Sequence, residues 1–318
     1  MGYDWHKLLI DKSQVALPHV LRCGQSFRWR FINGVWSIGL KNRVLMLRQE
    51  EKALYYTSVG PGQPGLSDEQ LIKDYFNLHV DLVKLYGEWA KDKRFHGHLA
   101  GIRILRQDPW ENLCSFICSS NNNIKRISKM VESLCREFGP YIATVDGHEY
   151  HDFPAPEALA ADSVEEKLRS LGFGYRAKYI NITAKMVCDM PAGLDYLQGL
   201  RDETYTDAHT ALLAFSGVGP KVADCVCLMS LDKHNCVPVD THVWQIATRD
   251  YRLSAKNNPK GHQAIQRYFQ DLWGEYAGWA HSVLFAADLS DLENGINVKS
   301  EPLIEVKTES TLETKLEP

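Results

Sequence analysis

Residues 216–229 read Ser-Gly-Val-Gly-Pro-Lys-Val-Ala-Asp-Cys-Val-Cys-Leu-Met, and an apolar-rich segment of helical pattern, 208–215, precedes them. The pattern predicts a helix, a hairpin built on Gly217 and Gly219, and a second helix that begins near Lys221. Glycines let backbone N–H groups approach a phosphate closely, and the second helix offers its positive N-terminus. The alternative is an ordinary helix connection with a glycine cap, because so short a pattern is weak by itself.

Lys221 and Asp240 are the two residues near this hairpin whose chemistry is most informative. A lysine at a helix start is disfavoured by the helix dipole, which predicts a lowered pKa and suits an amine nucleophile. Asp240 follows Val237-Pro-Val and is predicted to cap the next helix. If it lies close, it raises that pKa again and stabilises positive charge on a substrate. The alternatives are a solvated surface lysine and a plain helix cap.

Four further motifs lie in order along the chain: Cys23-Gly-Gln-Ser-Phe-Arg-Trp29, Phe116-Ile-Cys-Ser-Ser-Asn-Asn-Asn-Ile124, Leu171-Gly-Phe-Gly-Tyr-Arg-Ala-Lys178 and Tyr276-Ala-Gly-Trp-Ala-His-Ser-Val-Leu-Phe285. Together with residues 217–244, they resemble the eukaryotic 8-oxoguanine DNA glycosylases of the helix–hairpin–helix superfamily. The resemblance implies a bifunctional DNA glycosylase and AP lyase that excises 8-oxoguanine opposite cytosine from duplex DNA in base excision repair.

The resemblance also implies the catalytic roles. Lys221 attacks the sugar C1′, expels the base and forms an imine, after which β-elimination cuts the strand 3′ to the lesion. Asp240 stabilises the oxocarbenium-like charge. This chemistry requires no metal and no cofactor, and the cysteines of the iron–sulfur cluster found in the endonuclease III type are absent here.

The lesion pocket follows from the same match. A backbone carbonyl at Gly24 accepts from N7–H, which distinguishes 8-oxoguanine from guanine, and Cys225 and Phe285 sandwich the flipped base. A hairpin glycine and two core residues are the alternatives. His281 stands where the family usually has glutamine reading the Watson–Crick edge. A neutral imidazole donates at one nitrogen and accepts at the other, so base selectivity is where the match is weakest.

The remaining DNA contacts implied by the match fill the space left by the flipped base, hold the orphaned cytosine, bind phosphates or support the site. These are Asn121, Arg126, Tyr175, Arg176, Gly217, Gly219 and His242. An aromatic beside an arginine suits unstacking of a base step together with donation to base edges. Alternatives remain: Tyr175 as a core aromatic, 121–123 as a capping loop, and His242 as core packing.

The fold class predicted is α+β. Runs at 26–30, 35–40, 43–48 and 53–58, with turns at 33–34 and 41–42, indicate antiparallel strands, and after Ser67 almost every segment to residue 285 reads as helix. We therefore expect an N-terminal antiparallel β domain at 1–98 and an all-helical glycosylase domain at 99–290. Residues 291–318 are predicted to form an acidic, disordered tail.

The charge distribution matters more than the net charge of −4. Seven acids and three lysines place −4 in residues 291–318, so the body is neutral and can concentrate basic residues on one face. Eight cysteines without framework spacing favour a reduced protein. We expect no membrane segment, a monomer, and a nuclear enzyme by resemblance, with a mitochondrial pool as the alternative.

Two other functions remain open. His281 leaves room for a helix–hairpin–helix glycosylase that acts on another damaged purine, such as an alkylated one. A non-catalytic DNA-binding module would have little reason to combine the residues proposed for catalysis with those proposed for the pocket.

Overall fold

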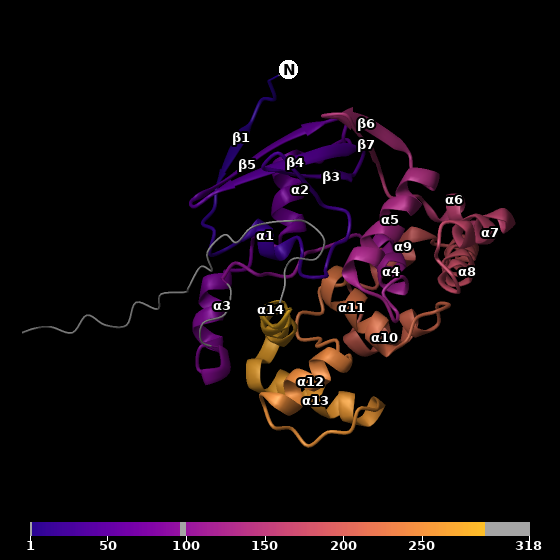
Figure 1. Ribbon diagram of the computed structural model, residues 1–318. Coiled ribbons are helices and arrows are strands. Elements are labelled where there is room, and N and C mark those ends of the chain that lie inside the picture. The colour runs from indigo at the N-terminus through magenta and orange to yellow at the C-terminus, as the bar shows by residue number, and fades with distance from the viewer. Residues whose placement is uncertain (1, 96–99, 290–318) are drawn as a thin grey trace, which may run out of the picture.

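The computed structural model describes residues 2–95 and 100–289 (Figure 1). The acidic tail predicted at 291–318 lies outside these residues. In the described part of the chain, an antiparallel sheet near the N-terminus is followed by a helical region, so the α+β class is confirmed. None of the helices in this part combines the length and apolar character needed to cross a bilayer.

The N-terminal sheet has five antiparallel strands in the order β1-β5-β4-β3-β2. Their bounds are β1 (His6–Leu9), β2 (Arg30–Ile32), β3 (Val35–Leu40), β4 (Arg43–Glu50) and β5 (Ala53–Val59). Both predicted turns are confirmed, because Asn33, Gly34, Lys41 and Asn42 all have positive φ. These left-handed pairs join β2 to β3 and β3 to β4.

The first predicted strand, 26–30, is wrong except for Arg30. Arg28 turns inward instead, where its guanidinium contacts Glu111 at 2.7 Å and donates to the carbonyls of Gly39 and His151. These long-range contacts outweigh a local strand preference. The sequence reading missed β1, a four-residue edge strand formed through pairing with β5.

The region predicted to be all-helical contains a hairpin, β6 (Tyr141–Val145) and β7 (His148–His151). Its turn is Asp146-Gly147, with φ of 48° and 79°, a dipeptide that signals this turn type. Val145 and Tyr150 pack with Val44 and Met46 of β4. The expectation of helix was therefore wrong here, because the hairpin is stabilised by the face of the N-terminal sheet.

The helices begin and end largely where the predicted breaks lie. They are α1 (Leu17–Val20), α2 (Asp68–Tyr75), α3 (Leu82–Trp89), η1 (Lys93–Phe95), α4 (Pro109–Ile117), α5 (Ile124–Phe138), α6 (Pro156–Ala160), α7 (Asp162–Ser170), α8 (Arg176–Asp189), α9 (Leu194–Gly199), α10 (Tyr205–Leu213), α11 (Pro220–Ser230), α12 (Thr241–Arg249), α13 (Pro259–Trp273), η2 (Gly274–Tyr276) and α14 (Ala277–Asp288). Ser67 and Gln70 form the predicted capping box of α2.

Besides the small cluster around the β6–β7 hairpin, two larger cores lie in the described part of the chain. One lies between the sheet and α1 and α2, with Leu17, Trp36 and Ile72 among its buried residues. The other fills the helical region and also takes up Phe27 and Leu82 from the N-terminal part of the chain. The helical core thus draws on residues of the predicted domain 1–98, and the predicted boundary itself falls at 96–99, outside the described residues.

Candidate active site

The predicted hairpin joins α10 to α11, and its conformation requires glycine at one position. Gly217 has φ +77°, and a Cβ there would lie 2.5 Å from Cγ of Tyr179. Gly219 is the N-cap residue of α11 and Pro220 occupies the first turn; no described side chain caps this end. The first N–H groups of α11 therefore lack a capping side chain, the arrangement that suits binding of a phosphate.

Lys221 and Asp240 meet at the starts of two helices. The Nζ of Lys221 lies 3.9 Å from Oδ2 of Asp240, and each side chain is about one-third exposed (35% and 34%). Oδ1 of Asp240 accepts from the backbone N–H groups of His242 and Val243, both at 3.0 Å, as the predicted cap of α12. Asp240 is therefore both a helix cap and the carboxylate that faces the lysine.

The pKa of Lys221 is shifted in the direction opposite to the one predicted from the helix dipole. Burial lowers it, but Cys225 and Asp240 raise it by more, so the net shift is upward. The Nζ also lies 5.2 Å from the ring centroid of Phe116, a contact that favours the charged form. The lowered pKa predicted from the helix dipole alone was therefore wrong, whereas the upward effect predicted for a nearby Asp240 is confirmed. Lys221 is an ammonium at rest.

Gly24 and Phe285 lie side by side, and Phe285 contacts the start of α12 two residues after Asp240. Gly24 has φ +82°, and a Cβ there would lie 3.3 Å from Cδ1 of Ile124 and 3.9 Å from Cε1 of Phe285. The ring of His242 stands nearly perpendicular to that of Phe285, with centroids 5.0 Å apart. Segments from both ends of the described chain thus meet at this candidate site.

Cys225 lies one helical turn after Lys221 and is buried. Cys225 is one of the groups that raise the pKa of Lys221. Burial raises the pKa of the thiol to about 11, so Cys225 is protonated at neutral pH. A protonated thiol is a poor nucleophile, so the chemistry of this helix falls to Lys221 and not to Cys225.

His281 on α14 is 7% exposed, and its ring centroid lies 6.2 Å from that of Phe285. Burial lowers the pKa of His281 to about 4, so the ring is neutral at physiological pH. Both ring nitrogens are buried without a hydrogen-bond partner among the described residues. Unpaired buried polar atoms are costly, and here they mark a place where a ligand can donate and accept.

Four of the predicted DNA contacts gather on the loop between α4 and α5 and at the start of α8. The guanidinium of Arg176 donates to the carbonyls of Ser120 and Asn121, and the Tyr175 hydroxyl donates to Ser120 O at 3.2 Å. Arg126 donates to the carbonyl of Gly172 at 3.3 Å. The structure thus brings these residues together.

These side chains differ in exposure. Tyr175 is 47% exposed and lies under the Arg176 guanidinium, so the alternative of a core aromatic is wrong. Arg176 is 3% exposed and supports the loop. Asn121 is exposed with φ +46°. Asn123 caps α5, as the capping-loop alternative predicted for this segment.

Sequence reasoning did not single out Phe116 and Ile124, which contact Lys221 and adjoin Gly24 respectively. Both stand at the ends of the quoted run 116–124, but an apolar residue in a helical pattern reads first as core. Their place in the quoted run was a signal that they belong to the site, whereas the local hydrophobic pattern gave no such signal.

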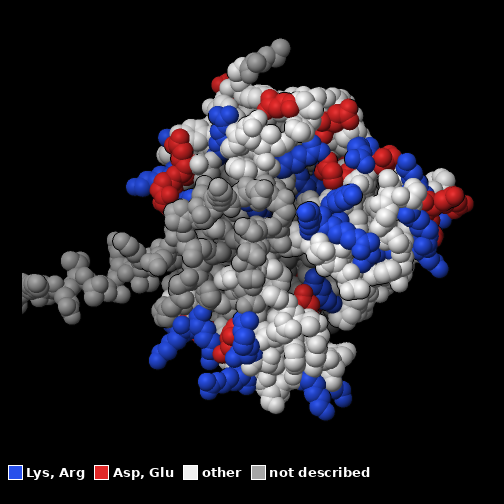
Figure 2. All heavy atoms as spheres, viewed as in Figure 1, with Lys and Arg blue, Asp and Glu red and all other residues white. Residues whose placement is uncertain are grey.

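Figure 2 shows that basic side chains on this face gather over α4 and α5 and near the ends of α12 and α13. Acidic side chains gather instead beside the sheet and at the outer ends of α6 and α7. Lys125, Arg126 and Lys129 at the start of α5 are all exposed. Although residues 1–290 carry no net charge, they present a basic surface next to the loop of Asn121, as predicted.

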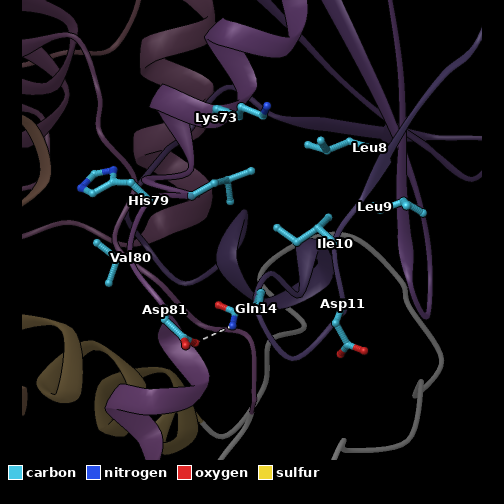
Figure 3. Close-up of a pocket in the computed structure, with 10 residues that line it drawn as sticks. Leu8, Leu9, Ile10, Asp11, Gln14, Lys73, His79, Val80 and Asp81 are labelled. Carbon is cyan, nitrogen blue, oxygen red and sulfur yellow. Dashed lines mark hydrogen bonds between the residues drawn. The ribbon is translucent and has the colours of Figure 1, made fainter.

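A pocket of about 430 Å³ lies elsewhere, between β1 and the start of α3 (Figure 3). Its walls combine Leu8, Ile10 and Val80 with Lys73, and Gln14 donates to Asp81 at 2.7 Å. None of the residues predicted for catalysis or DNA binding lines it.

Comparison with known proteins gives the following matches. Residues 7–113 match the model of the 8-oxoguanine DNA glycosylase N-terminal domain, and residues 114–275 match that of the HhH-GPD superfamily of base excision DNA repair proteins. The chain is 42% identical to an N-glycosylase/DNA lyase of Saccharomyces cerevisiae, over 91% of this chain and 87% of the relative. It is 40% identical to the N-glycosylase/DNA lyase OGG1 of Arabidopsis thaliana, over 94% and 84%.

Among solved structures, the fold is similar to that of the 8-oxoguanine glycosylase/lyase of Clostridium acetobutylicum, in complex with double-stranded DNA that contains cytosine opposite 8-oxoG. The TM-score is 0.74 and the identity 26%, with 90% of this chain and 98% of the other covered.

Proposed function

Because the chain belongs to the 8-oxoguanine DNA glycosylase family, it is a DNA N-glycosylase with DNA lyase activity, and we propose that it excises 8-oxoguanine paired with cytosine from duplex DNA. The observation that supports this most directly is the pairing of Lys221 with Asp240, 3.9 Å apart. An amine, a carboxylate and a cleft for a base are the parts that the chemistry requires.

The first step joins Lys221 to the sugar. Its Nζ, as the free amine, attacks C1′; the new C–N bond forms as the glycosidic bond breaks, and the base leaves with the electron pair and takes up a proton. The carboxylate of Asp240 stabilises the positive charge that develops on the sugar ring. Because Lys221 is an ammonium at rest, the proton must leave Nζ before the attack.

The second step cuts the strand. The sugar ring opens to give an imine between Nζ and C1′, a proton leaves C2′, and the 3′ phosphate is expelled by β-elimination. Hydrolysis of the imine returns the lysine. The protonated imine acts as the electron sink, so no metal or cofactor is needed for this step.

The lesion base is read by residues on three sides. The backbone carbonyl at Gly24 accepts from N7–H of 8-oxoguanine, Cys225 and Phe285 lie on the two faces of the base, and His281 pairs with its Watson–Crick edge. The two ring nitrogens of His281, which have no hydrogen-bond partner in the described part of the chain, support the last role, since one can donate and the other accept.

The DNA around the lesion contacts the loop and the hairpin. Asn121, Tyr175 and Arg176 fill the vacated space and hold the orphaned cytosine, with Arg126 beside them. Gly217 and Gly219 offer backbone N–H groups to a phosphate. His242 packs on Phe285 and supports the pocket.

Borohydride trapping tests the proposal. Wild-type protein should form a covalent complex with 8-oxoguanine duplex, and Lys221→Gln should not; trapping at wild-type yield by the variant would remove Lys221 from the mechanism. Duplexes with 8-oxoguanine opposite each of the four bases, and one with an alkylated purine, test the substrate. Faster release of the alkylated purine would favour the alternative that His281 leaves open.

Equal binding to damaged and undamaged duplex, with no strand cut, would instead indicate a DNA-binding module without catalysis. We further propose a monomer that acts in the nucleus. Light scattering at working concentration and imaging of a tagged full-length chain, with a mitochondrial marker as the second location, test these two points.

A further inference from the structure

A cluster of buried polar side chains lies behind the catalytic helix. Asp224 is on α11 between Lys221 and Cys225, but its carboxylate contacts the elements behind the helix. The Tyr205 hydroxyl on α10 donates to Oδ1 at 2.7 Å, and Nε2 of His209 lies 3.4 Å from the same oxygen. Asp224 is only 7% exposed, so these contacts replace water.

The same cluster reaches the segment that carries Asp240. The thiol of Cys236 donates to the carboxylate of Asp224 at 3.3 Å. Gln266 on α13 donates from Nε2 both to the Tyr205 hydroxyl and to the carbonyl of Val237, at 3.3 Å each. Residues 236 and 237 lead directly into Asp240. A hydrogen-bonded path therefore joins the helix of Lys221 to the segment of its partner carboxylate, across α10, α11 and α13 (Figure 1).

The protonation states of Asp224 and Tyr205 favour a stable hydrogen-bond network. Burial raises the pKa of Asp224, and the contacts with Tyr205 and His209 oppose that shift. Burial, together with Cys236 and Asp224, raises the pKa of Tyr205, so its hydroxyl remains a donor. A buried carboxylate that loses a donor is left unsatisfied, which makes the geometry of such a cluster rigid.

Rigidity matters here because the reacting groups come from two helices. A displacement of about 1 Å in a reacting group costs roughly a hundredfold in rate. The Lys221–Asp240 separation spans α11 and the start of α12, and the caps of these helices do not by themselves fix the distance between them.

We propose that Tyr205, Asp224 and Gln266 are positioning residues that hold Lys221 and Asp240 at their observed separation. The inference rests on the roles proposed above for Lys221 and Asp240. The three residues act through the helix and the segment that they connect, not through contact with the base.

Tyr205→Phe removes one hydroxyl and nothing else. Tyr251→Phe is the matched control, because its hydroxyl also donates to a carboxylate, that of Asp92, at 2.8 Å. We expect Tyr205→Phe to lower the single-turnover rate of base excision by about ten- to a hundredfold, at unchanged Kd for lesion duplex. Tyr251→Phe should stay within about twofold of wild type.

The pH profile separates positioning from a loss of folded protein. Asp240 contributes to the raised pKa of Lys221, so a wider separation should move the acid limb of the excision rate to lower pH. A smaller folded fraction lowers the rate equally at every pH. Asp224→Asn, whose side-chain oxygen still accepts from Tyr205, should retain about tenfold more activity than Asp224→Ala.

A wild-type rate and pH profile for Tyr205→Phe would overturn the inference, as would an equal loss in Tyr251→Phe. Lys221→Gln, assayed in parallel by borohydride trapping, keeps the two proposals distinguishable. If it still traps, the proposed nucleophile is wrong whatever Tyr205→Phe does. If it does not trap and Tyr205→Phe is unaffected, only the positioning inference fails.

Discussion

Gly24 and Phe285 lie side by side: a Cβ added to Gly24 would sit 3.9 Å from Cε1 of Phe285 and 3.3 Å from Cδ1 of Ile124. One residue follows the first helix of the chain and the other belongs to the last described helix. Any side chain at residue 24 would therefore contact both Ile124 and Phe285.

Gly24→Ala should remove most of the excision of 8-oxoguanine while AP-lyase activity on a pre-formed abasic site remains. The added methyl occupies the approach to the base, and φ +82° adds strain of about 1–2 kcal/mol. Single-turnover rates on 8-oxoguanine duplex and on a pre-formed abasic site measure the two activities separately. Gly34→Ala is the matched control: its φ is +79° but nothing lies within 4 Å of the new Cβ, so it should lose similar stability and keep both activities.

Asp240→Asn should separate the two roles of this residue. Asparagine caps a helix about as well as aspartate, so the melting temperature should hardly change. The charge that faces Lys221 is lost, and we expect excision to slow by roughly a hundred- to a thousandfold. Asp240→Ala should show the same kinetic loss and also lose about 1 kcal/mol of stability, measured by denaturant unfolding. A nearly active Asp240→Asn would contradict the electrostatic role.

The excision rate should rise with pH through the neutral range. The pKa of Lys221 is raised, so the attacking amine is a small fraction at neutral pH and grows about tenfold per pH unit below that pKa. Single-turnover excision rates between pH 6 and 9 measure this rise, which is the acid limb of the pH profile. In Asp240→Asn the limb should move to lower pH, because one of the groups that raises the pKa has lost its charge. A flat profile would show that proton loss from Lys221 does not limit the rate.

Acid should destabilise the protein through His281. The pKa of this ring is about 4 in the folded state and about 6.5 when unfolded, so below pH 6.5 the unfolded chain binds the proton first. The free energy of unfolding should therefore fall as pH drops from 6.5 to 4, by up to about 3 kcal/mol. His281→Gln should flatten this dependence in denaturant unfolding, whereas substitution of the exposed His6 should leave it unchanged.

Deletion of residues 291–318 should leave single-turnover excision intact. The segment carries the net charge of −4, so its loss should at most tighten binding to undamaged duplex at low salt. Titration of undamaged DNA at two salt concentrations measures this effect. A large loss of excision on deletion would show that the segment belongs to the folded enzyme.

Local signals allowed several elements to be predicted. The Ser67–Gln70 capping box, the Asp240 cap and the turns at 33–34 and 41–42 each depend on residues close in sequence, and the structure contains all of them. The motifs that carry the family resemblance likewise pointed to Lys221 and Asp240 together, which the structure places 3.9 Å apart.

The predictions that were wrong concern segments whose conformation depends on residues distant in the sequence. Arg28 lies outside any strand because its side chain binds the carboxylate of Glu111 on α4. The β6–β7 hairpin is stabilised by packing on β4. Neither partner is visible in a local pattern. The Asp146-Gly147 dipeptide does indicate a hairpin turn, but the segments before and after it have helical patterns, and the hairpin was therefore not predicted.

The sequence by itself determined several helix caps, the turns at 33–34 and 41–42 and the hairpin of Gly217 and Gly219, because each is carried by residues near one another in the chain. Only the tertiary structure decided that Gly24 meets Phe285, that neither ring nitrogen of His281 has a hydrogen-bond partner among the described residues, and that the pKa of Lys221 is raised. The physical reason is the same in each case. Burial and charge at an atom are set by every group within a few ångströms, and folding brings most of those groups from elsewhere in the chain.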